Sequence, residues 1–321
     1  MAVPPGGTTS PPLGADVLIS TLRKGVNPAL PATPGAAPYD YLTTCTTPTY
    51  DGSGNVTHPS VVDMGRKWNG YRWWLVDTPY PNMDDDFENP SIWGSNDRVT
   101  WEVPAGLTNP IDPWPGGETG RSATAFNSDP ELVWDAAGQR MVAYWRDADS
   151  TLPASIDFYA ATSTNGHTWT HTGVLLTIDA GAAWRSPGIA RVSDDDWRMW
   201  CLDNDTASDM YAAPGPLGPW TVAGEMTLAS DGSPVYGWHG DVTYDQGVYY
   251  SLIGDVGDAG PFRPAVSYDG LAWHRGGAAF GAGYRCTILP PRNGWVEVWY
   301  SQSLRLRYTR VPASLWTDLL P

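Results

Sequence analysis

The segment Ser267-Tyr-Asp-Gly-Leu-Ala-Trp273 decides the fold, because two other segments share its spacing: Ser95-Asn-Asp-Arg-Val-Thr-Trp101 and Ser163-Thr-Asn-Gly-His-Thr-Trp169. A degenerate fourth copy ends at Trp220. Asp-Gly and Asn-Gly accept a positive φ, so each copy predicts a tight turn after which a tryptophan enters the next strand. A turn repeated in this way indicates an architecture built from repeated β-hairpins.

Two further elements precede each turn. The nearer one is an aromatic strand, and before it comes a short segment that opens on a polar residue. The five openings are His58, Asp129, Ser186, His239 and Arg285. Opening strand, aromatic strand, small-residue strand and tryptophan strand make a four-stranded antiparallel meander, and five meanders predict an all-β fold, a five-bladed β-propeller. An irregular β-sandwich stays the alternative.

The domain boundaries follow from the same pattern. Residues 1–40 contain Pro-Pro-Gly-Gly and several further prolines, which predicts an extended Pro/Gly-rich N-terminal arm with at most a turn of helix around Val17–Lys24. Residues 41–321 are expected to form the propeller, with blades starting near 58, 129, 186, 239 and 285. The fifth unit shows three clear strands, so we expect residues 40–50 to supply its outer strand and close the ring.

Composition excludes several classes of protein. The 35 glycines and 30 prolines are too many for a helical protein, and the 18 tryptophans and 16 tyrosines are too many for a disordered one. A net charge of −16 disfavours nucleic acid and anionic membranes as partners, and no apolar run predicts membrane insertion. The three cysteines Cys45, Cys201 and Cys286 lack disulfide or zinc spacing, and the N-terminus lacks the features of a secretory signal.

The candidate site is the funnel on the propeller axis, because the opening residues of all five blades converge there. The expected ligand-binding residues are His58, Asn89, Arg185, Ser186, Trp238, His239 and Arg285. The expected catalytic residues, if the chain is an enzyme, are Asp129, Glu88 and Asp241. A channel that holds only water explains the same polar residues. No metal or cofactor is predicted, because the two histidines lack the short spacing of a metal motif; a structural divalent cation on the axis stays an alternative.

Two resemblances carry functional expectations. The repeated turns and the Asp129-Pro opening resemble glycoside hydrolase family 43 and its relatives. That resemblance implies catalysis by carboxylates at the blade openings, but only Asp129 matches, since the first blade offers His58 and the third offers Ser186. Whether the chain is an enzyme stays open; a catalytic pair would come from Asp129, Glu88, Glu131 and Asp241.

The second resemblance is closer and covers residues 58–111, which include His58-Pro-Ser-Val-Val, Glu88-Asn-Pro-Ser-Ile and Leu107-Thr-Asn-Pro-Ile111. These segments resemble minor tail proteins of phages that infect Gram-positive and actinobacterial hosts. The resemblance implies a virion component of the tail tip that binds cell-envelope polysaccharide through the funnel. It also implies contacts with other tail proteins through the N-terminal arm, and a homo-oligomer.

Two alternatives remain beside the tail-tip protein. One is a glycosidase that cleaves an envelope or plant-type polysaccharide with carboxylates in the same funnel. The other is a purely structural propeller in a tail assembly. Outside a virion, we would expect a soluble bacterial protein without a signal peptide.

Overall fold

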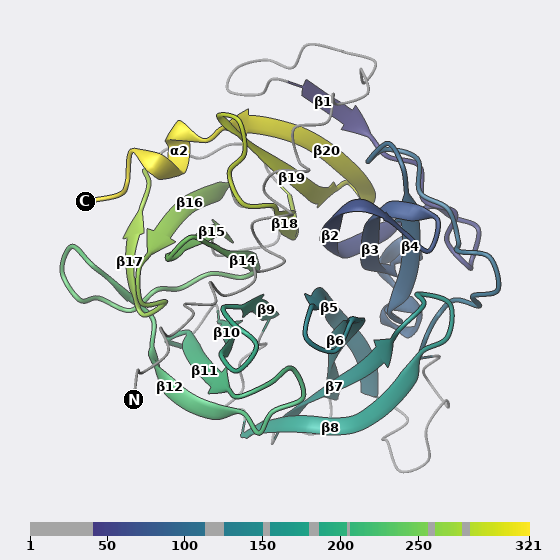
Figure 1. Ribbon diagram of the computed structural model, residues 1–321, viewed down its shortest axis with the longest axis horizontal. Coiled ribbons are helices and arrows are strands. Elements are labelled where there is room, and N and C mark those ends of the chain that lie inside the picture. Colours follow the sequence, from purple (N-terminus) through teal and green to yellow (C-terminus); the bar gives the residue numbers. More distant parts are fainter. Residues whose placement is uncertain are drawn as a thin grey trace, which may run out of the picture. The chain divides into compact units, whose positions relative to one another are not determined.

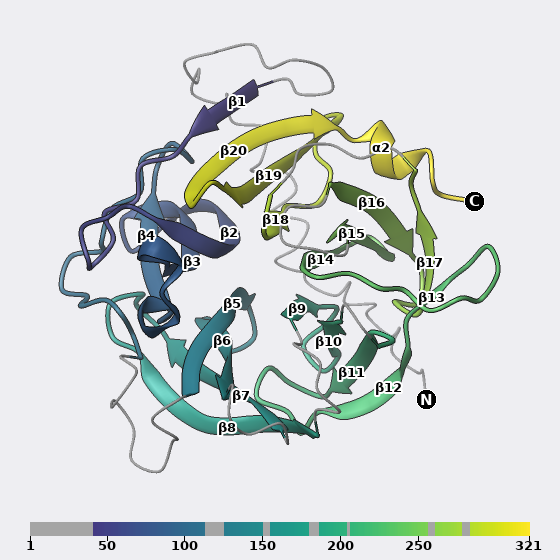
Figure 2. The same cartoon turned by 180° about the vertical axis from the view of Figure 1, so that it is seen from behind.

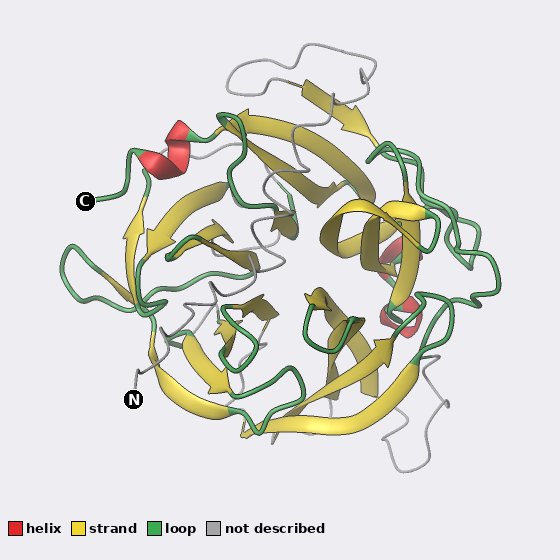
Figure 3. Ribbon diagram, in the orientation of Figure 1, coloured by secondary structure: helices red, strands yellow, loops and turns green. Residues whose placement is uncertain are grey.

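The computed structural model describes residues 41–112, 125–149, 155–179, 186–203, 206–255, 261–277 and 283–321. The regular structure in these ranges is almost entirely β, in five sheets arranged around a common centre (Figure 1). Its helical segments are three short ones: η1 (Pro81–Met83), η2 (Asp85–Phe87) and α2 (Ser314–Thr317) (Figure 3). The predicted five-bladed β-propeller is confirmed. The predicted arm and the turn at Val17–Lys24 lie outside the described residues.

Each sheet is one blade, and its strands follow one another outward from the centre. The first blade contains β2 (Val56–Trp68), β3 (Tyr71–Pro79) and β4 (Ser91–Ser95). The second contains β5 (Ala125–Asp135), β6 (Arg140–Asp149), β7 (Ser155–Ser163) and β8 (Thr170–Asp179). The third contains β9 (Ser186–Arg191), β10 (Trp197–Leu202), β11 (Asp209–Ala213) and β12 (Thr221–Glu225).

The last two blades complete the ring. The fourth contains β14 (Gly240–Asp245), β15 (Val248–Gly254), β16 (Phe262–Ser267) and β17 (Ala272–Arg275), with β13 (Thr227–Leu228) added parallel to β17. The fifth contains β18 (Cys286–Ile288), β19 (Trp295–Gln302), β20 (Arg305–Pro312) and β1 (Tyr41–Thr44). Two blades therefore differ from the expected four strands, since the first has three named strands and the fourth has five.

The ring closes through the start of the described chain. Strand β1 pairs antiparallel with β20, as the views from both sides show (Figure 2). The next residues reach the first blade, because the Thr46 N–H donates to the Val99 carbonyl and the Trp101 N–H donates to the Thr46 carbonyl. The expectation that residues 40–50 supply the outer strand of the fifth blade is confirmed.

The repeated turn owes its shape to two side-chain acceptors. In the copy that begins at Ser267, the serine hydroxyl accepts from the Gly270 N–H, and the Asp269 carboxylate accepts from the N–H groups of the two residues after the glycine. Ser163 with Asn165, and Ser95 with Asp97, make the equivalent bonds. The fourth residue of each copy has a positive φ: 76° at Arg98, 72° at Gly166 and 79° at Gly270. The spacing of the motif is thus a hydrogen-bond requirement.

Tryptophans of the second strands fasten neighbouring blades to these turns. Trp200 of the third blade donates its indole N–H to the Gly270 carbonyl of the fourth at 2.7 Å. Trp299 of the fifth blade donates to the Arg98 carbonyl of the first at 3.0 Å. The ring of Trp74 fills the space that a side chain at Gly166 would need. The turn residues Trp101, Trp220 and Trp273 are themselves buried, as expected for structural positions.

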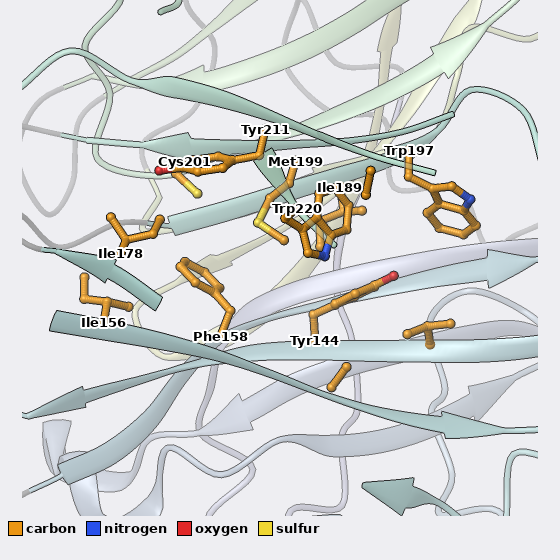
Figure 4. Close-up of a cluster of buried hydrophobic side chains, with 13 residues drawn as sticks. Tyr144, Ile156, Phe158, Ile178, Ile189, Trp197, Met199, Cys201, Tyr211 and Trp220 are labelled. Carbon is orange, nitrogen blue, oxygen red and sulfur yellow. The ribbon is translucent and has the colours of Figure 1, made fainter. Parts of the chain in front are cut away.

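Apolar side chains between the blades form the core. Figure 4 shows the cluster between the second and third blades, where Tyr144 and Phe158 lie opposite Ile189 and Met199. After the last strand, α2 buries Trp316, whose indole N–H donates to the Ser251 carbonyl of the fourth blade at 2.7 Å. Among the described residues, no helix has the length and apolar character needed to cross a membrane. The inner strands β2, β5, β9, β14 and β18 are left to line the axis.

Candidate functional site

Two bulges in neighbouring inner strands open the site. The pairing of β2 with β3 shifts between Thr57 and Ser60, and that of β5 with β6 shifts between Ser128 and Glu131. Each bulge holds an X-Pro dipeptide, His58-Pro59 or Asp129-Pro130, and proline has no N–H to give to the ladder. His58 has φ 52° and Asp129 has φ 49°, a strained backbone region for residues with a side chain. The bulges bring these two side chains together.

Three blades meet at one buried cluster. His58 Nε2 lies 2.8 Å from Asp129 Oδ1, and His239 Nδ1 lies 3.8 Å from the same oxygen. The two imidazole centroids are 5.1 Å apart. All three residues are at most 2% exposed. His239 immediately precedes β14, so the first, second and fourth blades each supply one member.

Two arginines set the charge of the cluster. Arg146 Nε, from β6, lies 2.8 Å from Asp129 Oδ2, and Arg285 Nη1 lies 3.7 Å from Oδ1. Burial opposes ionisation of Asp129, but the charge of Arg146 and the contact with His58 outweigh it and hold the pKa of Asp129 well below the usual range. Burial lowers the pKa of both histidines despite Asp129, and the arginines lower it further. At neutral pH the cluster therefore contains a carboxylate and two neutral imidazoles.

Glu88 borders the cluster from the loop of the first blade. It follows η2, and its Oε1 lies 3.6 Å from His58 Nδ1. The Thr78 hydroxyl lies 3.2 Å from the same ring nitrogen. Burial and the nearby charge of Asp129 raise the pKa of Glu88 well above its usual value. The site thus contains two buried carboxyl groups whose pKa values are shifted in opposite directions.

Beside the cluster, a set of buried hydrogen bonds made by Arg285 and Asp241, called the belt, joins the inner strands of different blades. Arg285 donates to the Ser186 hydroxyl at 2.9 Å, to Glu131 Oε2 at 3.0 Å and to the Pro187 carbonyl at 2.8 Å. Asp241 Oδ2 accepts from the Thr287 hydroxyl at 2.9 Å and from the Ile288 N–H at 2.8 Å. The predicted residues Ser186, Asp241 and Arg285 are therefore engaged in contacts between blades.

The remaining predicted residues have other surroundings. Asn89 donates to Tyr50 Oη at 3.3 Å and accepts from the Asn127 amide at 3.1 Å. Its side chain therefore bridges the segment that follows β1 and strand β5. Trp238 packs on His239, with ring centroids 5.0 Å apart. Arg185 lies outside the described residues.

Sequence reasoning missed Arg146 and Tyr284. The Tyr284 ring lies 4.6 Å from that of His239 and 5.1 Å from that of His58. It directly precedes the fifth opening, Arg285, and this adjacency is a signal that could have found it. Arg146 lies on a second strand, for which the pattern of openings holds no signal.

The cluster has the donors and spacing of a divalent-cation site. One ligand atom from each of His58, Asp129 and His239 lies within 4.8 Å of the other two. Tetrahedral bonds of about 2.1 Å to a cation would place neighbouring ligand atoms about 3.4 Å apart, and the contacts of Asp129 Oδ1 with His58 and His239, at 2.8 and 3.8 Å, lie on either side of that separation. Both ring nitrogens of His239 are buried and have no hydrogen-bond partner among the described residues. Buried polar atoms normally find a partner, so the two nitrogens of His239, beside a carboxylate and a second imidazole, have the donor chemistry that suits a divalent cation.

The comparisons connect this propeller to enzymes that act on glycans. No family model matches the chain. The A type blood N-acetyl-α-D-galactosamine deacetylase of Flavonifractor plautii is 46% identical over 94 residues, 29% of this chain and 12% of that protein's length. The chain thus spans about an eighth of this curated relative.

Solved structures show the same fold. An N-acetylgalactosamine deacetylase from F. plautii, in complex with blood group B trisaccharide, has a TM-score of 0.71 at 22% identity, covering 85% of this chain and 94% of that one. A putative exo-β-1,3-galactanase from Bifidobacterium bifidum has 0.57 at 12%, covering 84% and 91%. The α-L-arabinofuranosidase of Fusarium graminearum has 0.55 at 14%, covering 80% and 77%.

These findings correct the expected function. The prediction of a phage tail-tip protein is wrong, because the sequence match and the structural matches are to carbohydrate-active enzymes. The virion location and tail partners gain no support either. Residues 58–111, on which that resemblance rested, form β2 to β4 of the first blade together with the loop that carries Glu88. The coarser prediction is confirmed: the chain is a five-bladed β-propeller similar in structure to glycoside hydrolases.

Proposed function

We propose that this chain is a carbohydrate-directed hydrolase that uses a divalent cation in the funnel to remove the N-acetyl group of an amino sugar. The observation that carries the proposal is the buried cluster of His58, Asp129 and His239, in which His239 has no hydrogen-bond partner among the described residues. The 46% identical relative is named a deacetylase of N-acetylgalactosamine, which supports an amide rather than a glycosidic bond as the target.

The cluster would hold the cation through His58, Asp129 and His239. When bound, a divalent cation supplies a Lewis acid that polarises a carbonyl oxygen or a water molecule. Hydrolysis forms a bond between the water oxygen and the acyl carbon and breaks the C–N bond, releasing acetate and the free amine. The Glu88 carboxyl lies 3.6 Å from His58, and its raised pKa brings it nearer to the pH at which one group can both accept and return a proton. In its ionised form it would take the proton from the attacking water and return it to the leaving nitrogen.

Aromatic side chains beside the cluster support a sugar as the substrate. Tyr284 and Trp238 are partly exposed and flank His239 with ring centroids 4.6 and 5.0 Å away. Aromatic rings of this kind pack against the C–H faces of a pyranose, while neighbouring polar groups bind its hydroxyls.

The test compares two products from one reaction. The purified protein is stripped with EDTA, reloaded with Mn²⁺, Zn²⁺ or Co²⁺, and incubated with the 4-nitrophenyl glycoside of N-acetyl-α-D-galactosamine. We expect acetate release without 4-nitrophenol release, restored by a cation and lost in His239→Ala. His274→Ala, which changes a histidine on β17 in an outer part of the fourth blade, is the matched control and should retain activity. Absence of both acetate release and cation binding in the wild type would refute the proposal.

A glycosidase is the second candidate. It is favoured by Glu88 and Asp129, two buried carboxyl groups whose pKa values move apart, a pattern typical of an acid/base pair. Its signature in the same assay is 4-nitrophenol release that survives EDTA and disappears in Glu88→Gln.

A further inference from the structure

Arg146 faces the bulge that presents Asp129. It lies on β6 opposite Ser128, the last paired residue before the register shift. Its Nε lies 2.8 Å from Asp129 Oδ2, and the side chains are 5% and 0% exposed, respectively. The pair is therefore an ion contact shielded from water, and this shielding strengthens the attraction between the two charges.

The two oxygens of Asp129 have different neighbours. Oδ2 lies against Arg146, whereas Oδ1 lies 2.8 Å from His58 Nε2 and 3.8 Å from His239 Nδ1. Oδ1 also accepts from the Ser128 hydroxyl, at the longer distance of 3.4 Å. A rotation of the carboxylate would exchange the two oxygens and pull one of them away from Arg146. The arginine thus holds one oxygen and leaves the other facing both imidazoles.

Arg285, the second arginine near Asp129, is held by the belt. Its donors reach Ser186, Glu131 and the Pro187 carbonyl at 3.0 Å or less, whereas Asp129 Oδ1 is 3.7 Å away. Arg146 is consequently the better candidate for orienting Asp129.

We propose that Arg146 is a positioning residue that fixes one oxygen of Asp129, so that the other is presented singly to a divalent cation shared with His58 and His239. The inference rests on the proposed function, because it requires a cation in the cluster. Mutation of a residue that orients a metal ligand without binding the metal itself typically lowers metal affinity 10- to 100-fold. Charge alone predicts the opposite sign, since a nearby guanidinium repels a cation.

The experiment measures Mn²⁺ affinity of the full chain by titration calorimetry. Arg146→Met should weaken binding about 10- to 100-fold. Arg146→Lys keeps the charge without the planar guanidinium and should show a smaller loss. Arg140→Met is the matched control: Arg140 Nε lies 2.9 Å from Asp135 Oδ2 in the same pair of strands, away from the funnel, so affinity should not change. Near-UV circular dichroism checks folding, and Arg146→Lys alone carries the comparison if Arg146→Met does not fold.

The outcomes separate the inference from the function on which it rests. If the wild type binds Mn²⁺ and the folded Arg146 variants bind it as tightly or more tightly, the positioning role is wrong and the cation site stands. If the wild type binds neither Mn²⁺ nor Zn²⁺ nor Co²⁺, the proposed function fails, and the inference fails with it.

Discussion

His58 and Asp129 occupy the same position in neighbouring blades. Each precedes a proline, each lies in a bulge of the innermost strand, and their φ angles are 52° and 49°. A left-handed conformation costs a residue with a Cβ about 1–2 kcal/mol. The fold keeps this strain at both places, and its result is the 2.8 Å contact between the two side chains.

The strain predicts an unusual order of stability at position 58. We expect His58→Gly to be about 1 kcal/mol more stable than His58→Ala, because glycine adopts a positive φ freely. The free energy of unfolding in urea measures the difference. Thr57, one residue earlier in β2 and without a positive φ, is the control: there the glycine variant should be the less stable one. Alanine variants that are more stable at both positions would contradict the bulge geometry.

The fold could be predicted because its signals are local. Ser267 and Asp269 accept hydrogen bonds from N–H groups two or three residues away, so the short motif by itself determines the turn. The number of blades follows from the five polar openings, because the turn itself recurs three times with one degenerate copy. The missing outer strand of the last blade also pointed to ring closure, which β1 provides.

The site could be predicted only in part, because its contacts cross blades. The pattern of openings pointed to His58, Asp129 and His239, which lie inside the inner strands β2 and β5 and directly before β14. Nothing local shows that Arg146, on a second strand, reaches Asp129 across a bulge. The two histidines lack the short spacing of a metal motif, so the sequence predicts no metal there, whereas the propeller brings them together through the convergence of its inner strands.

The buried carboxyl of Asp77 should make the stability of the folded protein depend on pH. It is fully buried, its Oδ1 accepts from the Trp93 indole N–H at 2.7 Å, and burial raises its pKa well above the usual value. The folded state therefore resists ionisation of Asp77. The neutral carboxyl contributes fully to the free energy of unfolding below the unfolded-state pKa of about 3.9. This contribution is lost as pH rises towards the folded-state pKa. Asp77→Asn removes this titration, and its stability relative to wild type should rise by up to about 1.4 kcal/mol per pH unit over that window.

The measurement is the change with pH of the difference in unfolding free energy between Asp77→Asn and wild type. The absolute difference is not used, because the asparagine amide adds a destabilisation that does not depend on pH. Asp269→Asn is the control of opposite sign. Burial opposes ionisation there, but the N–H groups of Ala272 and Leu271 outweigh it and lower the pKa of Asp269. Its contribution is therefore present above pH 3.9 and lost as pH falls through the folded-state pKa, so this variant should lose most, relative to wild type, near neutral pH. Asn165 occupies the same place in another copy of the turn, so the substitution keeps the turn's acceptor. Parallel pH profiles for wild type and Asp77→Asn would count against a neutral buried carboxyl.

Ring closure predicts different outcomes for two deletions. Removing residues 1–30 leaves every described residue in place, and we expect a folded propeller. Removing residues 1–55 deletes β1 and the Thr46 contacts with the first blade, which exposes the edge of β20. An uncovered edge strand pairs with other chains, so this variant should aggregate in size-exclusion chromatography. A monodisperse longer deletion would show that β1 is dispensable for closure.

Tyr50 predicts a link between ring closure and the funnel loop. It belongs to the segment that follows β1, and its hydroxyl donates to the Phe87 carbonyl at 2.8 Å and accepts from the Asn89 amide at 3.3 Å. These two bonds flank Glu88. Each is worth about 0.5–1.5 kcal/mol, so Tyr50→Phe should loosen the loop while the stacked rings of Tyr50 and Phe87 remain.

Hydrogen exchange measures this loosening without a substrate. Amides of residues 84–89 should exchange about five- to tenfold faster in Tyr50→Phe, which corresponds to about 1 kcal/mol of local stability, while the inner strands stay unchanged. Tyr308→Phe also removes a tyrosine hydroxyl, one that donates to Glu297 in the fifth blade, and it should leave residues 84–89 unaffected. If Glu88 transfers the proton in hydrolysis, the rate of acetate formation should fall in Tyr50→Phe. The Mn²⁺ affinity should stay at the wild-type value, because none of the three cation ligands is on this loop. Equal exchange rates in wild type and Tyr50→Phe would mean that the loop holds Glu88 without help from the closing segment.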